Sequence, residues 1–552
     1  MNLVKKNFKV LLILFAPILI YWQALSGDFV LDDRTYFIEN DILPALKPWQ
    51  LSHIFFKPSN LWGEHLPLRD FFYVIEYNLF GLSPYGYHVV SLGLYILTGY
   101  ILYLFLSEVY SDTVYSQLKN HNPVFYKAEI SVFVVTILYL VHPSHVETVA
   151  YISGQKDLLV ALFSFLTMFL FYKYFNSRAG KGRLLSLGIL TYYLAFFSKL
   201  AAVSLILMIP VLWNISSEEH RLKSKRFFAV WIIINLPVVI WILIYKNILS
   251  SYNNMFLLED IDILGRIIRA VKMFGFYATH ALKPLPLSFG YPFDDVSVDL
   301  DKFFWAGIAV EVIFLSLLIL QRKKIIFFAS AIFFIFLIPV MQLFGRLNNA
   351  SLYDRYLSIS LLGLCILFER ALAVMFVNAK WLRFFALSIF LSVVIALSIL
   401  TLLYVPAFQS DIESTRNSYE KFPDWPTSSF NYTYSLIEGG KLDKAWDMVV
   451  NEESFSSPLW VREYFKGWIY LQRGEFGQSV STLAYPAMLA SGEGYFPFPS
   501  IPLGKALIAL GRYEEAKQEF QRALSSKIYQ PLEMYKSRKE LEKIARIKSK
   551  EQ

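Results

Sequence analysis

The chain contains almost no cysteine and few charged residues. Its one cysteine, Cys365, lies inside an apolar run, so the chain has no disulfide framework and cysteine gives no indication of the compartment. Charged residues make up 17% of the 552 residues, whereas a soluble domain has about 25%. This shortage of charge argues against an ordinary soluble globular protein.

Apolar residues take the place of the missing charge. Hydrophobic residues make up 56% of the chain and aromatic residues 17%, and they gather in runs of about 16–23 residues, the length of a helix that crosses a bilayer. The net charge of +8 does not indicate a nucleic-acid partner, because the basic residues occupy short connections between apolar runs, where they orient a membrane protein. The composition therefore predicts an all-α, polytopic membrane protein that binds no nucleic acid.

Eleven apolar runs are interpreted as spanning helices, so residues 1–405 are predicted to form a membrane bundle of about eleven spans. Residues 24–26, after the first run, could be the cleavage site of a signal peptide. We expect a retained first span instead, because many spans follow. The predicted spans are 10–26, 84–107, 128–143, 157–175, 184–197, 199–214, 227–247, 303–320, 325–344, 353–376 and 384–405.

Basic residues in the connections predict the side of the membrane on which each segment lies. With the basic connections inside, the N-terminus is cytoplasmic and the C-terminus extracytoplasmic, as at a bacterial inner membrane facing the periplasm. The long segments 27–83 and 248–302 then face outside, and within them 67–82 and 261–282 have the mixed pattern of interfacial helices. The basic connections are 5–9, 178–183, 221–226, 321–324 and 380–383.

Residues 406–552 are predicted to form a separate helical region outside the membrane. Charged residues become frequent here, and apolar residues follow a helical period. Three related units begin at Gly440, Gly474 and Gly511, at intervals of 34 and 37 residues. A period near 34 residues is typical of tetratricopeptide repeats, with an ordinary helical bundle as the alternative. Such a region would bind a protein or glycan partner, because a concave repeat surface suits an extended peptide.

Two adjacent carboxylates, Asp32 and Asp33, follow the first predicted span at its outer end. Polar groups beside a membrane are costly, so their position is informative. One carboxylate could act as a general base toward an incoming hydroxyl. Alternatively, the pair could hold a divalent cation against a phosphate, or form part of a solvated loop or a helix cap. The pair is therefore the candidate catalytic site, and the candidate metal site if a metal binds.

A second polar cluster lies at the outer end of the third predicted span and the start of the fourth. Its two histidines are three residues apart and share a helical face, but two histidines without a third well-spaced ligand are a poor zinc site. The cluster is predicted to line a polar cavity that binds a sugar or a phosphate, with hydrogen bonding at helix ends as the alternative. Its members are His142, His145, Glu147, Gln155, Lys156 and Asp157.

Four basic residues fall near the outer interface on this topology: Lys199, Lys283, Arg346 and Arg355. Cations on the outer side oppose the positive-inside trend, which indicates that they pair with anionic groups. Arginine suits bidentate binding of phosphate, and lysine binds it as a point charge. For Arg355, a local ion pair with Asp354 and snorkelling to headgroups are the alternatives. Together with the acidic pair, the four cations indicate an anionic ligand.

The order of these motifs resembles the transmembrane and tetratricopeptide-repeat O-mannosyltransferase family, which belongs to the GT-C membrane glycosyltransferases. The resemblance covers nearly the whole chain, is strongest over residues 27–160, and rests on the order and spacing of the motifs. These are the acidic pair, Leu66–Arg69, Phe80–His88, Val141–Glu147, Gly154–Asp157 and Ser198–Lys199, followed by the repeat region.

The resemblance implies an enzyme that transfers a mannose-like hexose, with inversion, from a polyprenyl-phosphate donor to a hydroxyl, such as Ser or Thr of a protein, on the extracytoplasmic face. Asp32 and Asp33 match the acidic pair that contains the family's catalytic carboxylate. The second cluster matches the rim of the active site, and the outer cations other than Lys283 fall where contacts to the lipid phosphate are expected. Leu200 departs from the pattern, which has an acidic residue at that position. The one possible cofactor is a divalent cation, which would bind at Asp32 and Asp33.

Three other classes of protein are compared with a transferase. A transporter would have ionisable residues near the bilayer midplane in repeated halves of the chain, whereas here they gather at one interface. A membrane polysaccharide ligase or polymerase, or a transferase that modifies a lipid-linked glycan, is closer. Such ligases, however, resemble one another through Arg and His residues in a long late outer loop, whereas here the acidic pair lies early in the chain. A scaffold that uses only its repeats would leave the outer polar residues without a role.

Overall fold

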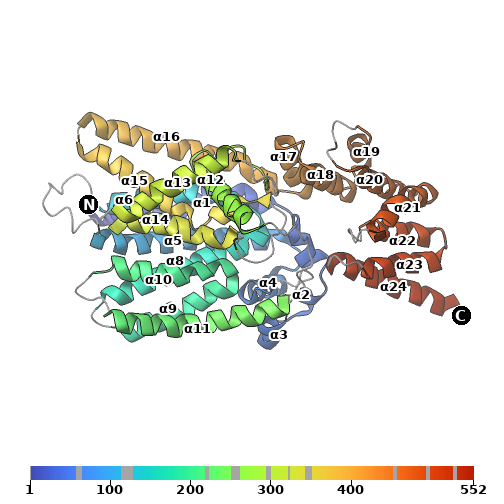
Figure 1. Cartoon of the computed structure of the whole chain (residues 1–552), viewed down its shortest axis with the longest axis horizontal. Helices are drawn as coiled ribbons and strands as arrows, with labels where there is room; N and C mark the ends of the chain where they lie inside the picture. The colour runs from blue at the N-terminus through green and yellow to red at the C-terminus, as the bar shows by residue number, and fades with distance from the viewer. Residues whose placement is uncertain are drawn as a thin grey trace.

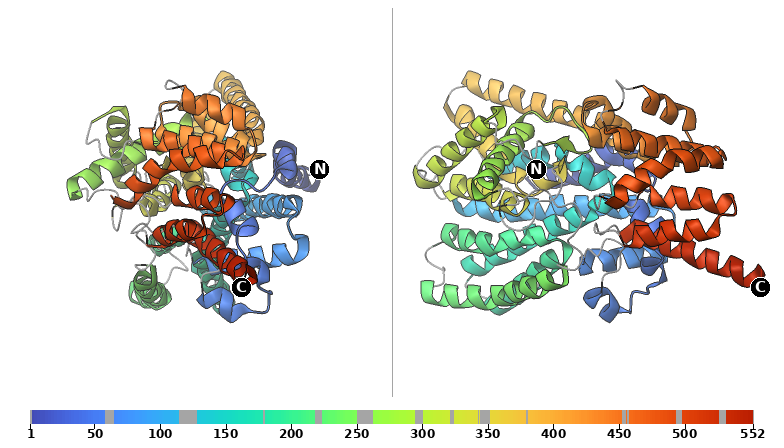
Figure 2. Two further views of the ribbon diagram at one scale, coloured as in Figure 1. Left: turned by 90° about the vertical axis from the view of Figure 1, so that its right-hand side faces the viewer. Right: turned by 45° about the vertical axis from the view of Figure 1, so that its right-hand side comes forward.

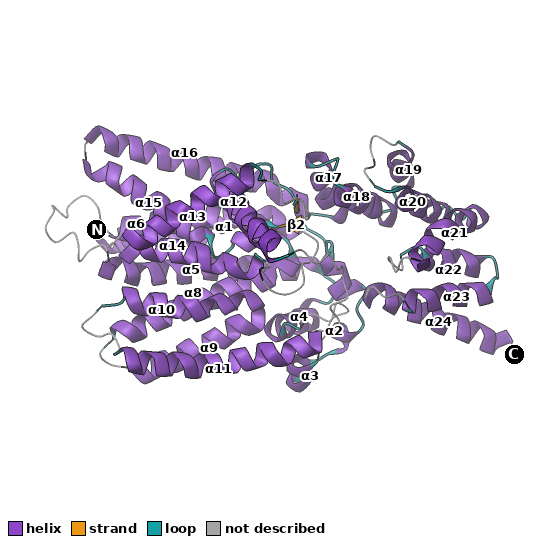
Figure 3. Cartoon of the chain, in the orientation of Figure 1, coloured by secondary structure: helices purple, strands orange, loops and turns teal. Residues whose placement is uncertain are grey.

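The protein consists almost entirely of α-helices, in two parts that follow one another along its long axis. Figure 1 shows a bundle of long helices near the N-terminus and a second group, α17 to α24, at the opposite end. Apart from loops and one short strand pair, the described residues are helical (Figure 3). This computed structural model describes residues 2–57, 65–113, 128–177, 180–217, 223–249, 262–293, 300–320, 324–341, 343, 351–378, 380–451, 455, 457–492, 498–525 and 531–551.

The first part extends from α1 to η9. Its α-helices are α1 (Asn2–Tyr21), α2 (Ile42–Ala45), α3 (Leu51–Phe56), α4 (Pro67–Phe80), α5 (Pro84–Thr113), α6 (Ala128–Val141), α7 (Val146–Ala150), α8 (Gln155–Asn176), α9 (Lys181–Ser198), α10 (Leu205–Ile215), α11 (Ser224–Leu249), α12 (Ile263–Leu282), α13 (Lys302–Leu320), α14 (Lys324–Leu337), α15 (Leu361–Asn378) and α16 (Lys380–Tyr404). Short turns of 3₁₀ or π type are η1 (Trp22–Ser26), η2 (Arg34–Ile38), η4 (Pro143–His145), η5 (Ile152–Gly154), η6 (Leu200–Ser204), η7 (Ile338–Val340), η8 (Asp354–Leu357) and η9 (Val405–Phe408).

A helix occupies each of the eleven predicted spans, but fewer of these helices are long and apolar enough to cross a bilayer. Helices α10 and α14 have 11 and 14 residues, below the roughly 20 that a crossing requires. The protein is an integral membrane protein, and its complement of about eleven spans stays a prediction. Within the described residues, five helices meet the requirement, at Phe8–Ser26, Pro84–Thr113, Ile152–Asn176, Ser224–Leu243 and Trp381–Phe408, and a bent pair, α6 with Pro143–Ala150, would make a sixth.

The break between α6 and α7 starts a short polar segment inside the bundle. Pro143 has no backbone N–H to continue α6, and His142 before it is extended, as residues before proline usually are. The two helices are bent by 55° at this break. The apolar helix therefore ends here, and the segment 142–157 brings the predicted second polar cluster to the start of α8.

A short strand pair positions the segment that precedes α15. Strand β1 (Tyr291–Pro292) pairs antiparallel with β2 (Ser351–Leu352). Because η8 follows β2 almost directly, this pairing ties η8 to the second outer segment. The two interfacial segments predicted at 67–82 and 261–282 form helices α4 and α12, which confirms their helical structure.

The second part is a row of helices that each pack on the next (Figure 2). The repeated glycines Gly440, Gly474 and Gly511 have positive φ angles of 70°, 79° and 74°, each in a turn between two helices. The three sequence units therefore coincide with three helical hairpins. The helices are α17 (Asp411–Lys421), α18 (Pro426–Glu438), α19 (Leu442–Val450), α20 (Leu459–Gln472), α21 (Phe476–Gly492), α22 (Ser500–Ala509), α23 (Tyr513–Leu524) and α24 (Pro531–Glu551).

The close packing of α22 on α23 depends on Gly504. A β-carbon at this position would lie 2.6 Å from the ring of Phe520, which is fully buried. We expect Gly504→Ala to destabilise this hairpin by about 1–3 kcal/mol, the usual cost of overpacking. Hydrogen exchange across 500–524 in the full-length protein should become faster. Gly477→Ala is the control, because nothing lies within 4 Å of a β-carbon there; equal exchange in the two variants would contradict this account.

Candidate active site

The buried member of the acidic pair is Asp33. Its Oδ1 accepts a hydrogen bond from the Ser153 N–H at 2.7 Å and another from the Ser153 hydroxyl, and its Oδ2 accepts one from the Val30 N–H at 3.2 Å. Burial raises the pKa of Asp33 to about 8, although these hydrogen bonds act in the opposite direction. Asp33 thus ties the segment that follows the first predicted span to η5, and both of its oxygens are occupied.

Asp32 differs from its neighbour because its carboxylate is available. The residue is partly exposed, and no residue in the described part of the chain forms a hydrogen bond or an ion pair with its side chain. Its backbone N–H donates to the Tyr151 hydroxyl at 3.2 Å. The main chain therefore holds Asp32 in place while its oxygens stay free, which is the arrangement that proton transfer requires.

Tyr151 connects Asp32 to a group of aromatic rings that extends to Arg355. Both Asp32 and Arg355 lie close enough to Tyr151 to interact electrostatically with its hydroxyl. The Tyr151 ring meets Phe289 edge-on at 5.9 Å, and Phe289 lies 5.7 Å from Tyr353. The Arg355 guanidinium lies over Tyr353, 4.0 Å from the ring centroid. A free carboxylate and a guanidinium therefore lie around one aromatic cluster.

Two ion pairs lie near the ring of Tyr356. Arg355 donates to Glu147 through its guanidinium and, at 3.0 Å, through its backbone N–H. The Lys199 ammonium lies 2.5 Å from a carboxylate oxygen of Asp157. The two cations lie 5.7 and 5.3 Å from the centroid of the Tyr356 ring, and both line a cavity of about 20 Å³ together with Asp157 and Tyr356. The fold thus gathers four of the predicted site residues.

The local ion pair considered between Asp354 and Arg355 does not form. One oxygen of Asp354 lies 2.8 Å from Nε2 of His280, and the other accepts a hydrogen bond from the Tyr291 hydroxyl at 2.9 Å. This alternative is wrong because neighbouring residues in a 3₁₀ turn direct their side chains to different sides. Asp354 therefore anchors η8 to α12 and β1, which leaves Arg355 to pair with Glu147.

Three members of the second predicted cluster have partners within the bundle. His142 forms a hydrogen bond of 2.9 Å with a backbone carbonyl at the end of α12, and His145 packs 4.4 Å from the ring of Tyr139. Gln155 donates to Glu76 at 2.8 Å. All of these side chains are buried. His142, His145 and Gln155 therefore stabilise the helix packing and do not join the group around Tyr356.

The structure gives less information about the other predicted residues, one of which lies outside the described ranges. Lys156 is half-buried at the start of α8. Arg346 falls in the range 344–350, which the structure does not describe. Lys283 follows α12 and lines two neighbouring hollows, of about 350 and 600 Å³. Lys283 therefore lines other hollows than the cavity that Lys199 and Arg355 line beside Tyr356.

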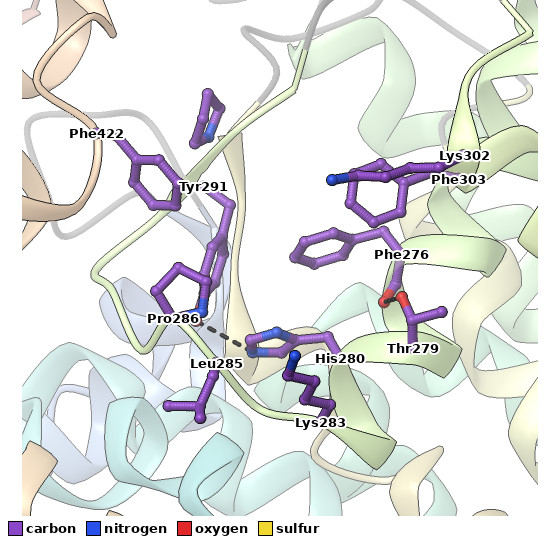
Figure 4. Close-up of a pocket in the computed structure, with 11 residues that line it drawn as sticks. Phe276, Thr279, His280, Lys283, Leu285, Pro286, Tyr291, Lys302, Phe303 and Phe422 are labelled. Carbon is purple, nitrogen blue, oxygen red and sulfur yellow. Dashed lines mark hydrogen bonds between the residues drawn. The ribbon is translucent and has the colours of Figure 1, made fainter.

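The hollows beside Lys283 form what we call the lysine groove, defined by Lys283, Lys302 and Lys421. Figure 4 shows the first hollow, with Phe422 on one side, Lys302 on the other and Lys283 below. The second hollow also borders Leu400 and Leu403 of the last span. Lysines next to exposed apolar side chains of a span suit a lipid that has an anionic headgroup.

Metal binding was considered for Asp32 and Asp33. In the ranges that the structure describes, no group of three or more His, Cys, Asp or Glu side chains could hold a metal ion. Asp33 uses both oxygens in hydrogen bonds to protein donors. Of the acidic pair, only the Asp32 carboxylate is therefore available, within the described residues, to bind a ligand.

Sequence patterns did not reveal three residues that hold the acidic pair. Tyr151 and Ser153 contact it from a turn about 120 residues further along the chain. Asp411 accepts a hydrogen bond from the Leu31 N–H at 2.5 Å, across 380 residues of sequence. The Ser410–Asp411 pair does signal a helix start, but a local signal gives no information about a distant partner.

Similarity to curated proteins extends over less than a third of the chain. The chain is 30% identical over 173 residues to Protein O-mannosyl-transferase F38B6.6 of Caenorhabditis elegans, which covers 30% of this chain and 23% of that protein. It is 31% identical over 170 residues to Protein O-mannosyl-transferase TMTC4 of Mus musculus, with coverage of 29% and 22%. It is 26% identical over 175 residues to Protein O-mannosyl-transferase TMTC2 of Homo sapiens, with coverage of 30% and 18%.

These relatives are protein O-mannosyl-transferases of the TMTC type, the group that the order of motifs resembles, so the resemblance is confirmed. The matched part spans about a fifth of the length of these relatives. No family model matches the chain. No solved structure matches it either.

Proposed function

We propose, from this likeness, that the protein is an inverting membrane glycosyltransferase of the GT-C type. It would transfer a hexose, mannose by analogy with the relatives' names, from a polyprenyl-phosphate donor to a hydroxyl of a protein Ser or Thr, on the extracytoplasmic face. The observation that supports this most is the free carboxylate of Asp32, which shares one aromatic cluster with Arg355.

Asp32 acts as the general base. It accepts the proton of the acceptor hydroxyl while that oxygen attacks the anomeric carbon, and the bond from that carbon to the phosphate oxygen breaks on the opposite face. A positioned general base contributes roughly 10²–10⁴-fold to the rate. The products are the glycosylated acceptor, the polyprenyl phosphate and a proton on Asp32 that passes to water. Asp33 fixes the segment through Ser153.

Arg355 and Lys199 hold the phosphate of the donor. The guanidinium can bind two phosphate oxygens at once, and the ammonium adds a point charge. Glu147 and Asp157 fix these cations before the donor binds. Charges that are already in position stabilise a leaving anion with little reorganisation. Because the phosphate leaves as an anion, the reaction needs no separate acid.

The lysine groove gives the donor lateral access from the membrane. Leu403 of the last span is 73% exposed beside it and would contact the polyprenyl chain. Lys283 and Lys421 would attract the phosphate. Tyr404 lines the groove, and its ring lies 5.4 Å from Phe408, which in turn lies 6.3 Å from Tyr151. The groove thus adjoins the aromatic cluster that contains the site.

The hairpins α17 to α24 serve as the acceptor platform. Their first helix contacts the segment that contains Asp32, so a peptide held on them would lie near the base. If these hairpins are tetratricopeptide repeats, their concave face suits an extended peptide. On this proposal, the C-terminal part and the site both lie on the extracytoplasmic side.

The identity of the donor tests the proposal. We expect the purified protein to transfer labelled mannose to a Ser/Thr-rich peptide from polyprenyl-phosphate mannose and not from a nucleotide-linked mannose. A peptide in which Ala replaces Ser and Thr is the control, because it has no hydroxyl acceptor. Transfer from the nucleotide sugar in the absence of lipid would contradict a lipid-phosphate mechanism. Other hexoses on the same lipid would define the sugar preference.

A further inference from the structure

Leu31 adopts a backbone conformation that residues with a β-carbon rarely take. Its φ is 52°, and it is the one non-glycine residue with positive φ in the described ranges. This conformation crowds the β-carbon against a carbonyl oxygen, so it persists only where the surroundings hold it. Leu31 directly precedes Asp32. Whatever holds Leu31 therefore determines the direction in which the chain presents the Asp32 carboxylate.

The group that holds Leu31 belongs to the C-terminal hairpin region. Oδ1 of Asp411, the first residue of α17, accepts the Leu31 N–H at 2.5 Å. Oδ2 of the same carboxylate accepts from the Arg34 guanidinium at 3.2 Å. The Asp28 N–H also donates to the Gln409 carbonyl at 3.0 Å. Asp411 thus contacts the first outer segment on both sides of the acidic pair.

Asp411 is well placed to restrain this segment. Its side chain is 18% exposed, so water competes little for its hydrogen bonds. Arg34 also lies 3.6 Å from Glu438 of α18, which adds a second contact between the same two parts of the protein. The first two helices of the hairpin region, α17 and α18, therefore both bind the segment that contains Asp32.

We propose that Asp411 is a positioning residue for Asp32: by accepting the Leu31 N–H, it maintains the left-handed conformation that orients the Asp32 carboxylate toward the acceptor hydroxyl. This inference rests on the proposed role of Asp32 and deepens it. The start of the hairpin region is then a structural part of the transferase site, besides any part it has in binding the acceptor.

The first test combines Asp411→Ala with Leu31→Gly. Asp411→Ala should lower kcat by about tenfold with little change in the KM for the donor, because the left-handed conformation of leucine is then no longer held. Adding Leu31→Gly should restore at least about a third of the lost rate, because glycine adopts this conformation without a penalty. A double variant no faster than Asp411→Ala, or a single variant with wild-type kcat, would overturn the proposal.

Asp411→Asn separates the hydrogen bond to Leu31 from the ion pair to Arg34. The amide oxygen can still accept the Leu31 N–H, so kcat should stay within about threefold of wild type. A loss as large as that of Asp411→Ala would assign the effect to Arg34 and overturn the proposal. Asp443→Ala is the matched control, because its ion pair with Arg473 lies on the hairpin surface.

Hydrogen exchange distinguishes failure of this inference from failure of the proposed function. Exchange at the Leu31 amide should be faster in Asp411→Ala than in wild type, whether or not Asp32 is the base. Faster exchange with unchanged kcat would overturn the positioning role. Unchanged exchange would show that Asp411 does not hold Leu31. If Asp32→Asn retains full transfer while exchange at the Leu31 amide is faster in Asp411→Ala, the role of Asp32 as base fails and the contact between Asp411 and Leu31 stands.

Discussion

Asp32→Asn is expected to lower the rate of sugar transfer by about 10²–10⁴-fold, the usual contribution of a general base. Asparagine has nearly the shape of aspartate but cannot accept the proton. Because the described residues provide no partner for the Asp32 side chain, the substitution should break no hydrogen bond or ion pair. We therefore expect an unchanged melting temperature and an unchanged KM for the lipid donor. Single-turnover rates with polyprenyl-phosphate mannose measure the effect.

Asp33→Asn is the matched control for this prediction. It replaces one of the oxygens that accept from Ser153 and Val30 by an amide group that donates, so a buried donor meets another donor. We expect a loss of about 1–3 kcal/mol in the free energy of unfolding and a partial loss of transfer. The opposite pattern, in which Asp33→Asn is stable and inactive and Asp32→Asn is active, would show that Asp33 is the base and Asp32 is not.

Arg355→Gln should have the second largest effect. Loss of a group that stabilises the developing negative charge costs roughly 10²–10³-fold in kcat. The single substitution also leaves Glu147 buried without its cation, which commonly costs about 3–5 kcal/mol of stability. The double variant Glu147→Gln/Arg355→Gln removes both charges, so we expect it to recover stability and not transfer. Melting temperature and kcat, measured on the same preparations, separate the two effects.

The ion pair of Glu369 with Arg370 provides the control for Arg355. This pair also joins a fully buried glutamate to an arginine, at 2.6 Å, but it lies within α15, where Glu369 accepts from the Tyr110 hydroxyl and Arg370 donates to Ser131. Arg370→Gln should lower stability without a selective loss of kcat. If the two arginine variants lose stability and transfer in the same proportion, Arg355 has a structural role only.

The helical plan of the protein could be predicted because its signals are local. Apolar runs identified a helix at every predicted span, and the glycines at 440, 474 and 511 identified three hairpin turns. The number of full crossings could not be predicted in the same way. A run of apolar residues indicates where a helix can form but not where it is interrupted. The 3₁₀ turn η6 precedes α10 and the 3₁₀ turn η7 follows α14, so both α-helices are shorter than their apolar runs.

The residues of the site were easier to predict than their partners. Glu147 and Arg355 were both expected at the site, but their contact joins residues 208 apart, which no local pattern encodes. Asp32 and Asp33 are adjacent and identical, so the sequence alone does not show which carboxylate is free. In the structure Ser153 donates to Asp33 only, which leaves the Asp32 carboxylate available. The His142 and His145 pair shares a helical face in sequence, yet the bend at Pro143 buries both rings in packing contacts.

The far end of the hairpin region also reaches the first outer segment. Tyr535 and Lys539 of α24 bond to Asp41, and Lys536 lies 3.3 Å from Glu39. The contact between Tyr535 and Asp41 joins residues 494 apart in sequence. At roughly 5–20 residues per second, the ribosome would make Tyr535 about 25–100 s after Asp41. The contacts of α24 with Glu39 and Asp41 can therefore form only after translation has passed Tyr535, long after the segment that contains the acidic pair has been made.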